Sequence, residues 1–257
     1  MESHISEFSY GYALTSELVA LYNLKAAGAP EFETQNAEGK AGGGWDVKLP
    51  GIPIFLQYKR SSRMVKNTAG EAGLFPGLPI FRMYLHRRNH SDQHQLLLDL
   101  ESQGNVVAYA APGFSEPAEL NDAYSSDKAA ERSIFVRPSA VGQLQDDDHH
   151  WIAFQANHPV AFFCSEPRRI KFERPSILFS KGDATKLYRG RGTPRPELYE
   201  KLAEELLSVF ENRRPTLFER QRISDIRKVR ERRDAPDFAR LIARTLFQCE
   251  LLILPVA

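Results

Sequence analysis

Residues 42–60 constrain the fold of this chain more than any other stretch, because they place polar side chains inside segments that are otherwise apolar. The pattern predicts two short strands, at residues 45–49 and 54–59, joined by a tight turn at a Pro-Gly pair. A glycine triplet precedes the first strand. The sequence therefore predicts a β-hairpin inside a larger sheet.

Three polar side chains distinguish this hairpin from an ordinary buried one. Side chains alternate across a strand, so Gln57 and Lys59 share one face of the second strand. Asp46 lies on the first strand, opposite its apolar face. Burial of an acid, an amide and an amine is unfavourable unless they pair or bind a metal. We therefore interpret the hairpin as a candidate catalytic site.

Asp46 followed by Gln57-x-Lys59 resembles the D-x(n)-(D/E/Q)-x-K motif of PD-(D/E)XK nucleases. The glutamine form, with glycines before the aspartate and Lys-Arg closing the strand, is similar to Mrr-type restriction endonucleases. The resemblance covers roughly the first 110 residues. It implies a Mg²⁺ or Mn²⁺ ion held by Asp46, Gln57 and the backbone carbonyl of Tyr58. It also implies that Lys59 orients the attacking water and stabilises the developing charge.

Glu17 lies in the apolar stripe of a helix predicted at residues 11–27. In PD-(D/E)XK enzymes a glutamate on the first helix often joins the metal site, so the resemblance makes Glu17 a second metal ligand and a catalytic residue. The alternative is a glutamate at the edge of the stripe whose carboxylate reaches solvent. Both interpretations stay open at this point.

The predicted elements follow the α-β-β-β-α-β order of the PD-(D/E)XK core. They are a helix at 11–27, strands at 32–35, 45–49 and 54–59, a helix at 92–103 and a strand at 106–110. The sequence thus predicts an α/β (α+β) fold with a restriction-endonuclease-like core, a mixed sheet flanked by helices. Added strands and a C-terminal helical region would complete it.

The rest of the chain divides into additions to this core and a C-terminal region. We predict a surface excursion at 61–78, a helix at 117–132, a basic linker or arm at 168–196 and an amphipathic helix at 196–210. Extra strands are predicted at 80–86, 133–136, 151–155 and 160–164. Residues 1–167 would form the nuclease domain, and residues 168–257 the linker and helical region. The apolar C-terminal segment must pack back on the fold.

Residues 213–244 contain eleven lysines and arginines against five aspartates and glutamates. This excess favours a phosphate-contacting surface, to which we assign Arg227 and Arg230 together with Arg60 and Arg63 beside the hairpin. The alternative is a solvated face with ion pairs at i,i+4 spacing, such as Arg227 with Glu231 or Arg233 with Asp237.

Composition sets only broad limits on the function. A net charge of +1 requires any basic surface to be local. The two cysteines are too few for a disulfide framework and lack metal-site spacing. The polar, acidic N-terminus has no signal-peptide pattern, and no apolar run is long enough to span a bilayer. We therefore expect a cytoplasmic protein.

The sequence leads to one preferred function and two alternatives. The preferred function is a metal-dependent DNA endonuclease, Mrr-like, that restricts or defends against foreign DNA. Because Gln57 replaces an acidic ligand, the first alternative is a catalytically inactive nuclease fold that binds nucleic acid. The second is a protein-interaction module of a defence or repair system. Besides DNA, the partners left open are a second copy of the chain and other proteins of such a system.

Overall fold

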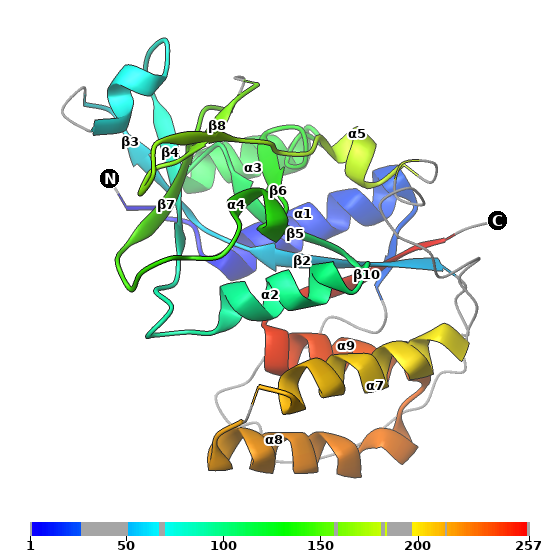
Figure 1. Cartoon of the computed structure of the whole chain (residues 1–257). Coiled ribbons are helices and arrows are strands. Elements are labelled where there is room, and N and C mark those ends of the chain that lie inside the picture. The colour runs from blue at the N-terminus through cyan, green and yellow to red at the C-terminus, as the bar shows by residue number, and fades with distance from the viewer. Residues whose placement is uncertain are drawn as a thin grey trace.

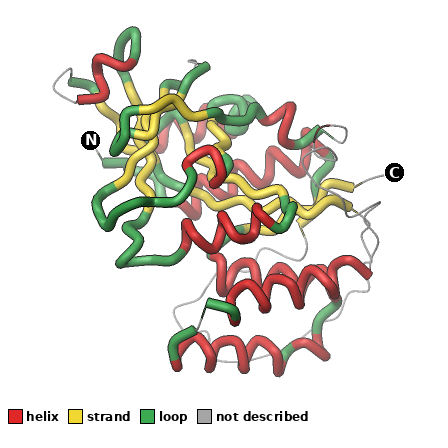
Figure 2. Tube along the Cα trace, viewed as in Figure 1, coloured by secondary structure: helices red, strands yellow, loops and turns green. Residues whose placement is uncertain are grey.

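The computed structural model describes residues 2–26, 51–66, 70–156, 159–180, 183, 197–213 and 215–255. The protein is of mixed α/β type, with two sheets and a group of C-terminal helices (Figure 1, Figure 2). The predicted α/β class, the added strands and the helical C-terminal region are confirmed.

The first sheet contains the only parallel pair among the described strands and has the order β1-β10-β2-β5-β6. Its strands are β1 (Lys25–Ala26), β2 (Gly51–Tyr58), β5 (Val106–Pro112), β6 (Ser133–Val136) and β10 (Glu250–Pro255). β2 is parallel to β5, and the other neighbouring pairs are antiparallel. β2 and β5 are buried along almost their whole length, so both have continuous apolar sequences.

β10 occupies the edge of β2 that the sequence analysis assigned to a preceding strand. Leu252 of β10 lies opposite Ile54 in antiparallel register, and the other edge of β2 pairs with β5. A strand has only two hydrogen-bonding edges, so the predicted hairpin is wrong. The strand predicted at 54–59 is confirmed as β2. The strands predicted at 32–35 and 45–49 lie outside the described residues.

The first sheet has helices on both faces (Figure 1). Helix α1 (Glu7–Tyr22) packs through Leu14 and Leu18 against the face that carries Ile54. The other face is covered by α2 (Gln93–Ser102), α7 (Glu197–Glu211) and α9 (Ala235–Phe247).

Helix α1 begins and ends earlier than predicted. Ser6 caps its start by accepting from the backbone N–H of Ser9 at 2.9 Å, and Asn23 ends it in a left-handed conformation with φ 51°. The predicted helix at 92–103 is confirmed as α2, with Leu96, Leu97 and Leu100 buried.

The second sheet is entirely antiparallel and has the order β3-β4-β7-β8-β9. Its strands are β3 (Ser61–Met64), β4 (Ile80–Leu85), β7 (His150–Phe154), β8 (Ala161–Phe163) and β9 (Arg168–Ile170). The strands predicted at 80–86, 133–136, 151–155 and 160–164 are confirmed.

Three predicted segments need correction. The excursion at 61–78 contains β3 and the 3₁₀ helix η1 (Gly70–Leu74), and the arm at 168–196 contains β9 and helix α5 (Pro175–Leu178). β3 and β9 are short, polar edge strands, so they lack the apolar signal that predicts a strand. Helix α3 (Pro117–Ser125) is shorter than predicted, because Asp127 adopts a positive φ of 52° soon after its end.

The C-terminal helices lie beneath the first sheet, with α8 (Leu217–Lys228) on the far side of α7 and α9 (Figure 1). Thr216 and Glu219 form a capping box at the start of α8. The chain then returns to the first sheet as β10, so this inner strand belongs to the region predicted to start at residue 168. The remaining short helices are α4 (Pro138–Val141) and the 3₁₀ helix η2 (Arg230–Arg232).

Candidate active site

Lys59 follows β2 directly and places its side chain against the first turn of α2. Its backbone N–H donates to the carbonyl of Ala110 at 2.9 Å, which extends the β2–β5 pairing by one residue. The side chain is only 3% exposed. Its Nζ atom donates to Oε1 of Gln93 at 2.8 Å. The lysine thus lies at the carboxyl ends of two parallel strands, where open α/β sheets commonly bind ligands.

Gln93 links the lysine to two further amides. Its Nε2 donates to Oε1 of Gln57 at 3.1 Å and to Oε1 of Gln248 at 2.8 Å. Gln248 adopts a left-handed conformation with φ 54° between α9 and β10, which turns the chain back into the sheet. The amide cluster, defined as Gln57, Gln93 and Gln248, therefore joins three distant parts of the chain around one amine.

The environment of Lys59 disfavours its charged form. Burial lowers the pKa of the Lys59 amine to about 8, and the negative charge of Glu7 only partly opposes this shift. Within the part of the chain that the structure describes, the amine forms no ion pair with a carboxylate. A buried, uncompensated cation is unfavourable for stability, so it indicates a functional position more often than a structural one.

Ser61 lies two residues after the lysine and carries a buried polar side chain. The residue is fully buried at the start of β3, and its hydroxyl has no hydrogen-bond partner among the described residues. Buried hydroxyls usually have a partner, so Ser61 is a candidate ligand-contacting residue. The sequence analysis did not predict a role for it.

Tyr58 turns to the opposite face of β2, towards α1. Its hydroxyl forms a 2.6 Å hydrogen bond with Oγ1 of Thr15, and its ring packs edge-on against Tyr10. Gly11 makes this packing possible, since a Cβ atom there would lie 2.7 Å from the Tyr58 ring. The carbonyl of Tyr58, predicted as a metal ligand, accepts from Nε2 of Gln57 at 3.1 Å.

Glu17 lies on α1, on the same side of the first sheet as Tyr58, and its carboxylate binds backbone N–H groups. Its carboxylate is 4% exposed and accepts from the N–H groups of Ala129 and Ala130 at 2.5 and 3.1 Å. Burial raises the pKa of Glu17, and these two hydrogen bonds oppose the shift. The amine of Lys59 lies on the other side of the sheet. The predicted convergence of Glu17 with Lys59 is therefore wrong, because the two side chains leave opposite faces.

The side chains that the structure describes do not form a binding site for a divalent cation. Among them there is no group of three or more histidine, cysteine, aspartate or glutamate residues that could hold a metal. The oxygens of Glu17 and Gln57 already accept hydrogen bonds, and Gln57 lies beside an amine. Mg²⁺ prefers carboxylate oxygens and water, so this donor set does not fit it. Asp46 lies outside the described residues.

The residues predicted to contact DNA differ in their surroundings. Arg60 is exposed, and its backbone N–H contacts Glu7 at 3.4 Å. Arg63 pairs with Glu119 at 3.1 Å. Arg227 pairs with Glu204 and Glu211 of α7, and Arg230 pairs with Glu204. A role in phosphate contact stays a prediction for all four.

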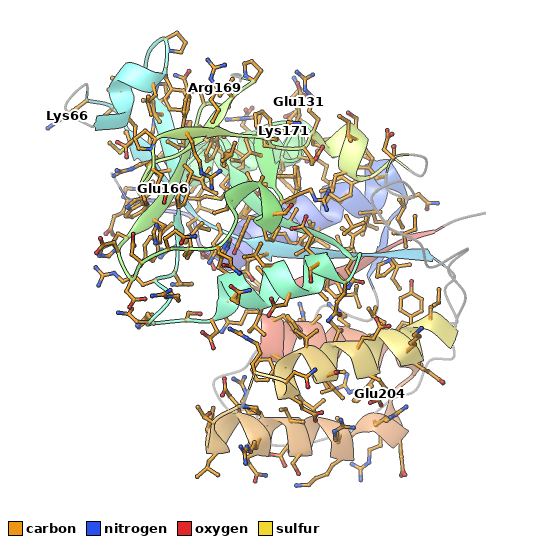
Figure 3. The ribbon with its side chains drawn as sticks, viewed as in Figure 1. Lys66, Glu131, Glu166, Arg169, Lys171 and Glu204 are labelled. Atoms are coloured by element: carbon orange, nitrogen blue, oxygen red, sulfur yellow. The ribbon has the colours of Figure 1, made fainter. Side chains whose placement is uncertain are left out.

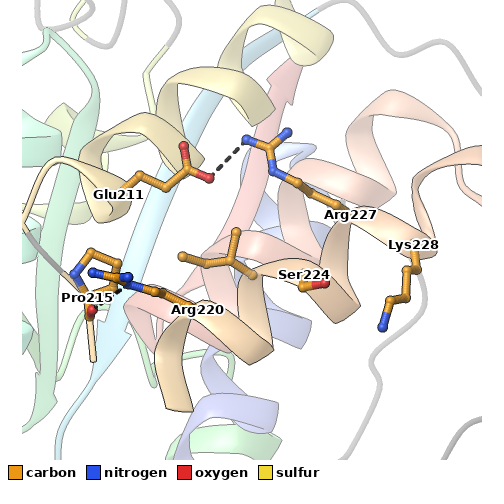
Figure 4. A pocket seen from close by; sticks show the side chains of 7 residues that line it. Glu211, Pro215, Arg220, Ser224, Arg227 and Lys228 are labelled. Atoms are coloured by element: carbon orange, nitrogen blue, oxygen red, sulfur yellow. Dashed lines mark hydrogen bonds and ion pairs between the residues drawn. The ribbon is translucent and has the colours of Figure 1, made fainter. Parts of the chain in front are cut away.

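The basic helices combine ion pairs with open cationic surface. Arg233 pairs with Asp237 at 2.7 Å as predicted, whereas Arg227 pairs with α7 instead of Glu231. A shallow pocket of about 810 Å³ lies along α8 (Figure 4). The side chains that line it come mainly from α8: Glu211, Pro215, Arg220, Ile223, Ser224, Arg227 and Lys228. Other charged side chains at the surface, including Lys66, Arg169 and Lys171, are labelled in Figure 3.

Sequence reasoning missed Gln93, Gln248 and a buried ion-pair cluster. Glu250, at the start of β10, accepts from Nε of Arg240 and Nε of Arg244, each at 2.7 Å. Arg240 is 3% exposed and Glu250 is 8% exposed. The only local signal for this cluster is a pair of arginines at i,i+4 spacing on a helix. An apolar strand that begins with an acid follows this helix.

Comparison with known proteins gives no match to a family model, a curated sequence or a solved structure. No helix within the described ranges has both the length and the apolar character needed to cross a bilayer.

Proposed function

We propose that this protein is a Mrr-like DNA endonuclease of the PD-(D/E)XK type with a restriction-endonuclease-like core, which acts in restriction of foreign DNA. The observation that carries the proposal is the buried Lys59 amine, which follows Gln57 at motif spacing and lacks a carboxylate partner among the described residues. The helix–strand–helix–strand order of α1, β2, α2 and β5, with β2 parallel to β5, agrees with such a core.

Lys59 would stabilise charge on the scissile phosphate. With a pKa of about 8 the amine is mostly protonated at neutral pH. A cation held in a desolvated site stabilises developing negative charge more strongly than one in water. Gln93 would keep the amine in place, since its Oε1 accepts one of the three N–H groups of the ammonium and leaves the others for a phosphate.

The proposed Mg²⁺ or Mn²⁺ ion depends on Asp46. Glu17 and Gln57 are engaged in protein hydrogen bonds, so this aspartate would be the principal protein ligand. When bound, such an ion would supply Lewis-acid stabilisation of the phosphate. DNA is the proposed partner of this site, and a second copy of the chain is a further candidate partner.

The test is plasmid cleavage by the full chain with and without a chelator. Lys59→Met should abolish cleavage while the fold and DNA binding persist, because the amine acts on the transition state. Asp46→Ala should abolish it through loss of metal, whereas Gln57→Glu should preserve it or tighten metal binding. Lys201→Met, at an exposed position of α7, is the matched control and should cleave like the wild type. Chelator-resistant cleavage that survives Lys59→Met would overturn the assignment.

The second candidate is a catalytically inactive nuclease fold that binds nucleic acid. The specific observation in its favour is the amide cluster around Lys59, because neutral amides and an amine suit a phosphate better than a metal cation. Under this alternative no substrate is cleaved, methylated DNA included, yet binding weakens steeply and linearly in log–log terms as salt rises.

A further inference from the structure

The outer face of the second sheet carries a row of aromatic rings. Tyr84 of β4 lies directly opposite Trp151 of β7, with ring centroids 4.8 Å apart. The rings of His86 and His149 lie 5.6 and 5.5 Å from the Tyr84 ring. His149 and Trp151 are nearly parallel, with an interplanar angle of 15°. These four rings form the aromatic platform.

The platform faces away from the main hydrophobic core. Alternate residues of β4, Phe81, Met83 and Leu85, are buried in that core, so Tyr84 points to the other side of the strand. Tyr84, His86 and Trp151 are partly exposed and His149 is exposed. The rings therefore present surface to solvent that a purely structural aromatic cluster would bury.

Arg82 extends the platform along the same face. Its guanidinium lies 4.9 Å from the centroid of the Trp151 ring and pairs with Glu71 at 3.2 Å. On its other side Arg82 lines a hollow of about 540 Å³ together with Met64 and Cys164. A cation, stacked rings and an adjacent hollow thus follow one another across the sheet.

The platform adjoins the candidate active site. Ser61 of β3 lies opposite Met83 of β4 in antiparallel register, so Lys59 and Arg60, which precede β3, lie near the end of β4 that carries Tyr84 and His86. Burial lowers the pKa of His86, and the positive charge of Lys59 lowers it further. Arg60 is exposed on the connection between β2 and β3. Two of the three aspartates that precede His149 have side-chain partners, since Asp146 lies 3.2 Å from His150 and Asp147 pairs with Arg88.

We propose that the aromatic platform binds the unpaired bases of single-stranded nucleic acid next to Lys59. Every base has a π-face, and proteins bind single strands by stacking bases on aromatic side chains while cations contact the phosphates. Arg60 is exposed and is placed to contact the phosphates of a strand that crosses the platform. The inference rests on the proposed function for its nucleic-acid substrate, and it adds that unpaired bases of that substrate are bound beside Lys59.

Binding can be measured without cleavage, so the two proposals fail separately. The chain has two tryptophans, and Trp45→Phe leaves Trp151 as the only one. In chelator, a thymidine oligonucleotide of about 20 nucleotides should quench Trp151 fluorescence, because stacked bases contact the indole ring. Anisotropy of a labelled oligonucleotide with the unaltered chain gives the same affinity independently of the Trp45 change.

Tyr84→Ala and Trp151→Ala should each weaken single-strand binding about tenfold or more, and Trp151→Phe should retain most of it. Affinity for the same sequence as a blunt duplex should change little. Tyr124→Ala is the matched control, because Tyr124 is 43% exposed and also lies beside another tyrosine, Tyr12. It should bind like the wild type. Circular dichroism and thermal unfolding identify any variant that has lost its fold.

Three results would overturn the proposal. The first is equal affinity for single strand and duplex that is unaffected by Tyr84→Ala and Trp151→Ala in folded protein. The second is equal quenching by dextran sulfate, which would show a response to any polyanion. The third is quenching by a neutral oligosaccharide and not by the oligonucleotide, which would assign the platform to carbohydrate.

Discussion

Lys59 and Gln93 form a 2.8 Å hydrogen bond that joins the end of β2 to the first turn of α2. Within the described residues the amine bonds to the neutral amide of Gln93, which continues to Gln57 and Gln248. The arrangement holds a cation in a buried position, which lowers the free energy of unfolding.

Lys59→Met should stabilise the fold at pH 7. Methionine has a similar length and no charge to desolvate, and lowering the lysine pKa to about 8 corresponds to roughly 3 kcal/mol. The gain will be smaller, about 1–3 kcal/mol, because Oε1 of Gln93 loses its donor. Urea unfolding of both proteins measures the difference. A clear loss of stability would mean that the amine is a structural hydrogen-bond donor.

The stability difference between wild type and Lys59→Met should shrink as pH rises. The pKa of Lys59 is about 8 in the folded protein and 10.5 in the unfolded chain, so the unfolded chain binds more protons between these values. Stability of the wild type relative to the variant therefore rises with pH across this window. Below pH 8 the penalty is complete, and above about 10.5 it disappears. Paired unfolding curves at pH 7 and pH 10 check this, and a constant difference would contradict it.

Glu17→Ala should destabilise the protein. Glu17→Gln should cleave DNA as the wild type does, because Glu17 is not part of the proposed site. The alanine leaves the N–H groups of Ala129 and Ala130 buried without an acceptor, which costs roughly 2–4 kcal/mol. Glu131→Ala, at an exposed position nearby, should change stability by less than about 0.5 kcal/mol. Loss of cleavage in a stable Glu17→Gln protein would instead restore Glu17 as a catalytic residue.

Leu252→Ala should destabilise the protein as strongly as a change in the centre of a core. Leu252 is fully buried opposite Ile54, so the truncation costs about 2–5 kcal/mol. Leu217→Ala removes the same atoms from a side chain that is 84% exposed and should cost less than about 0.5 kcal/mol. Equal, small effects on chemical denaturation would show that β10 does not hold the sheet together.

Local pattern was enough to predict much of the secondary structure. The apolar run after the Pro-Gly pair located β2, and strand alternation assigned Gln57 and Lys59 to one face, opposite Tyr58. Helical periodicity located α2 and α7. These features depend on neighbours within a few residues, which is the range that periodicity reports.

The position of Glu17 shows where periodicity stops being informative. Its place in an apolar stripe left open a carboxylate that binds a metal and one that reaches solvent, and the side chain is buried. The partner of this carboxylate could be a metal ion or a hydrogen-bond donor, and helical periodicity does not distinguish the two. The backbone N–H groups of Ala129 and Ala130 come from more than a hundred residues away, so only the folded chain supplies them.

The sequence by itself determined most of the apolar strands and the longer helices, and which of their side chains share a face, because backbone sterics and alternation are local. Short polar edge strands such as β3 and β9 carry no such local signal. The tertiary structure decided which strand lies beside β2 and what surrounds Lys59. An apolar segment such as β10 satisfies its hydrogen bonds equally well beside many strands, and long-range packing of α7 and α9 selects the edge of β2. That choice places Gln248 next to Gln93, and so it completes the buried environment that lowers the pKa of Lys59.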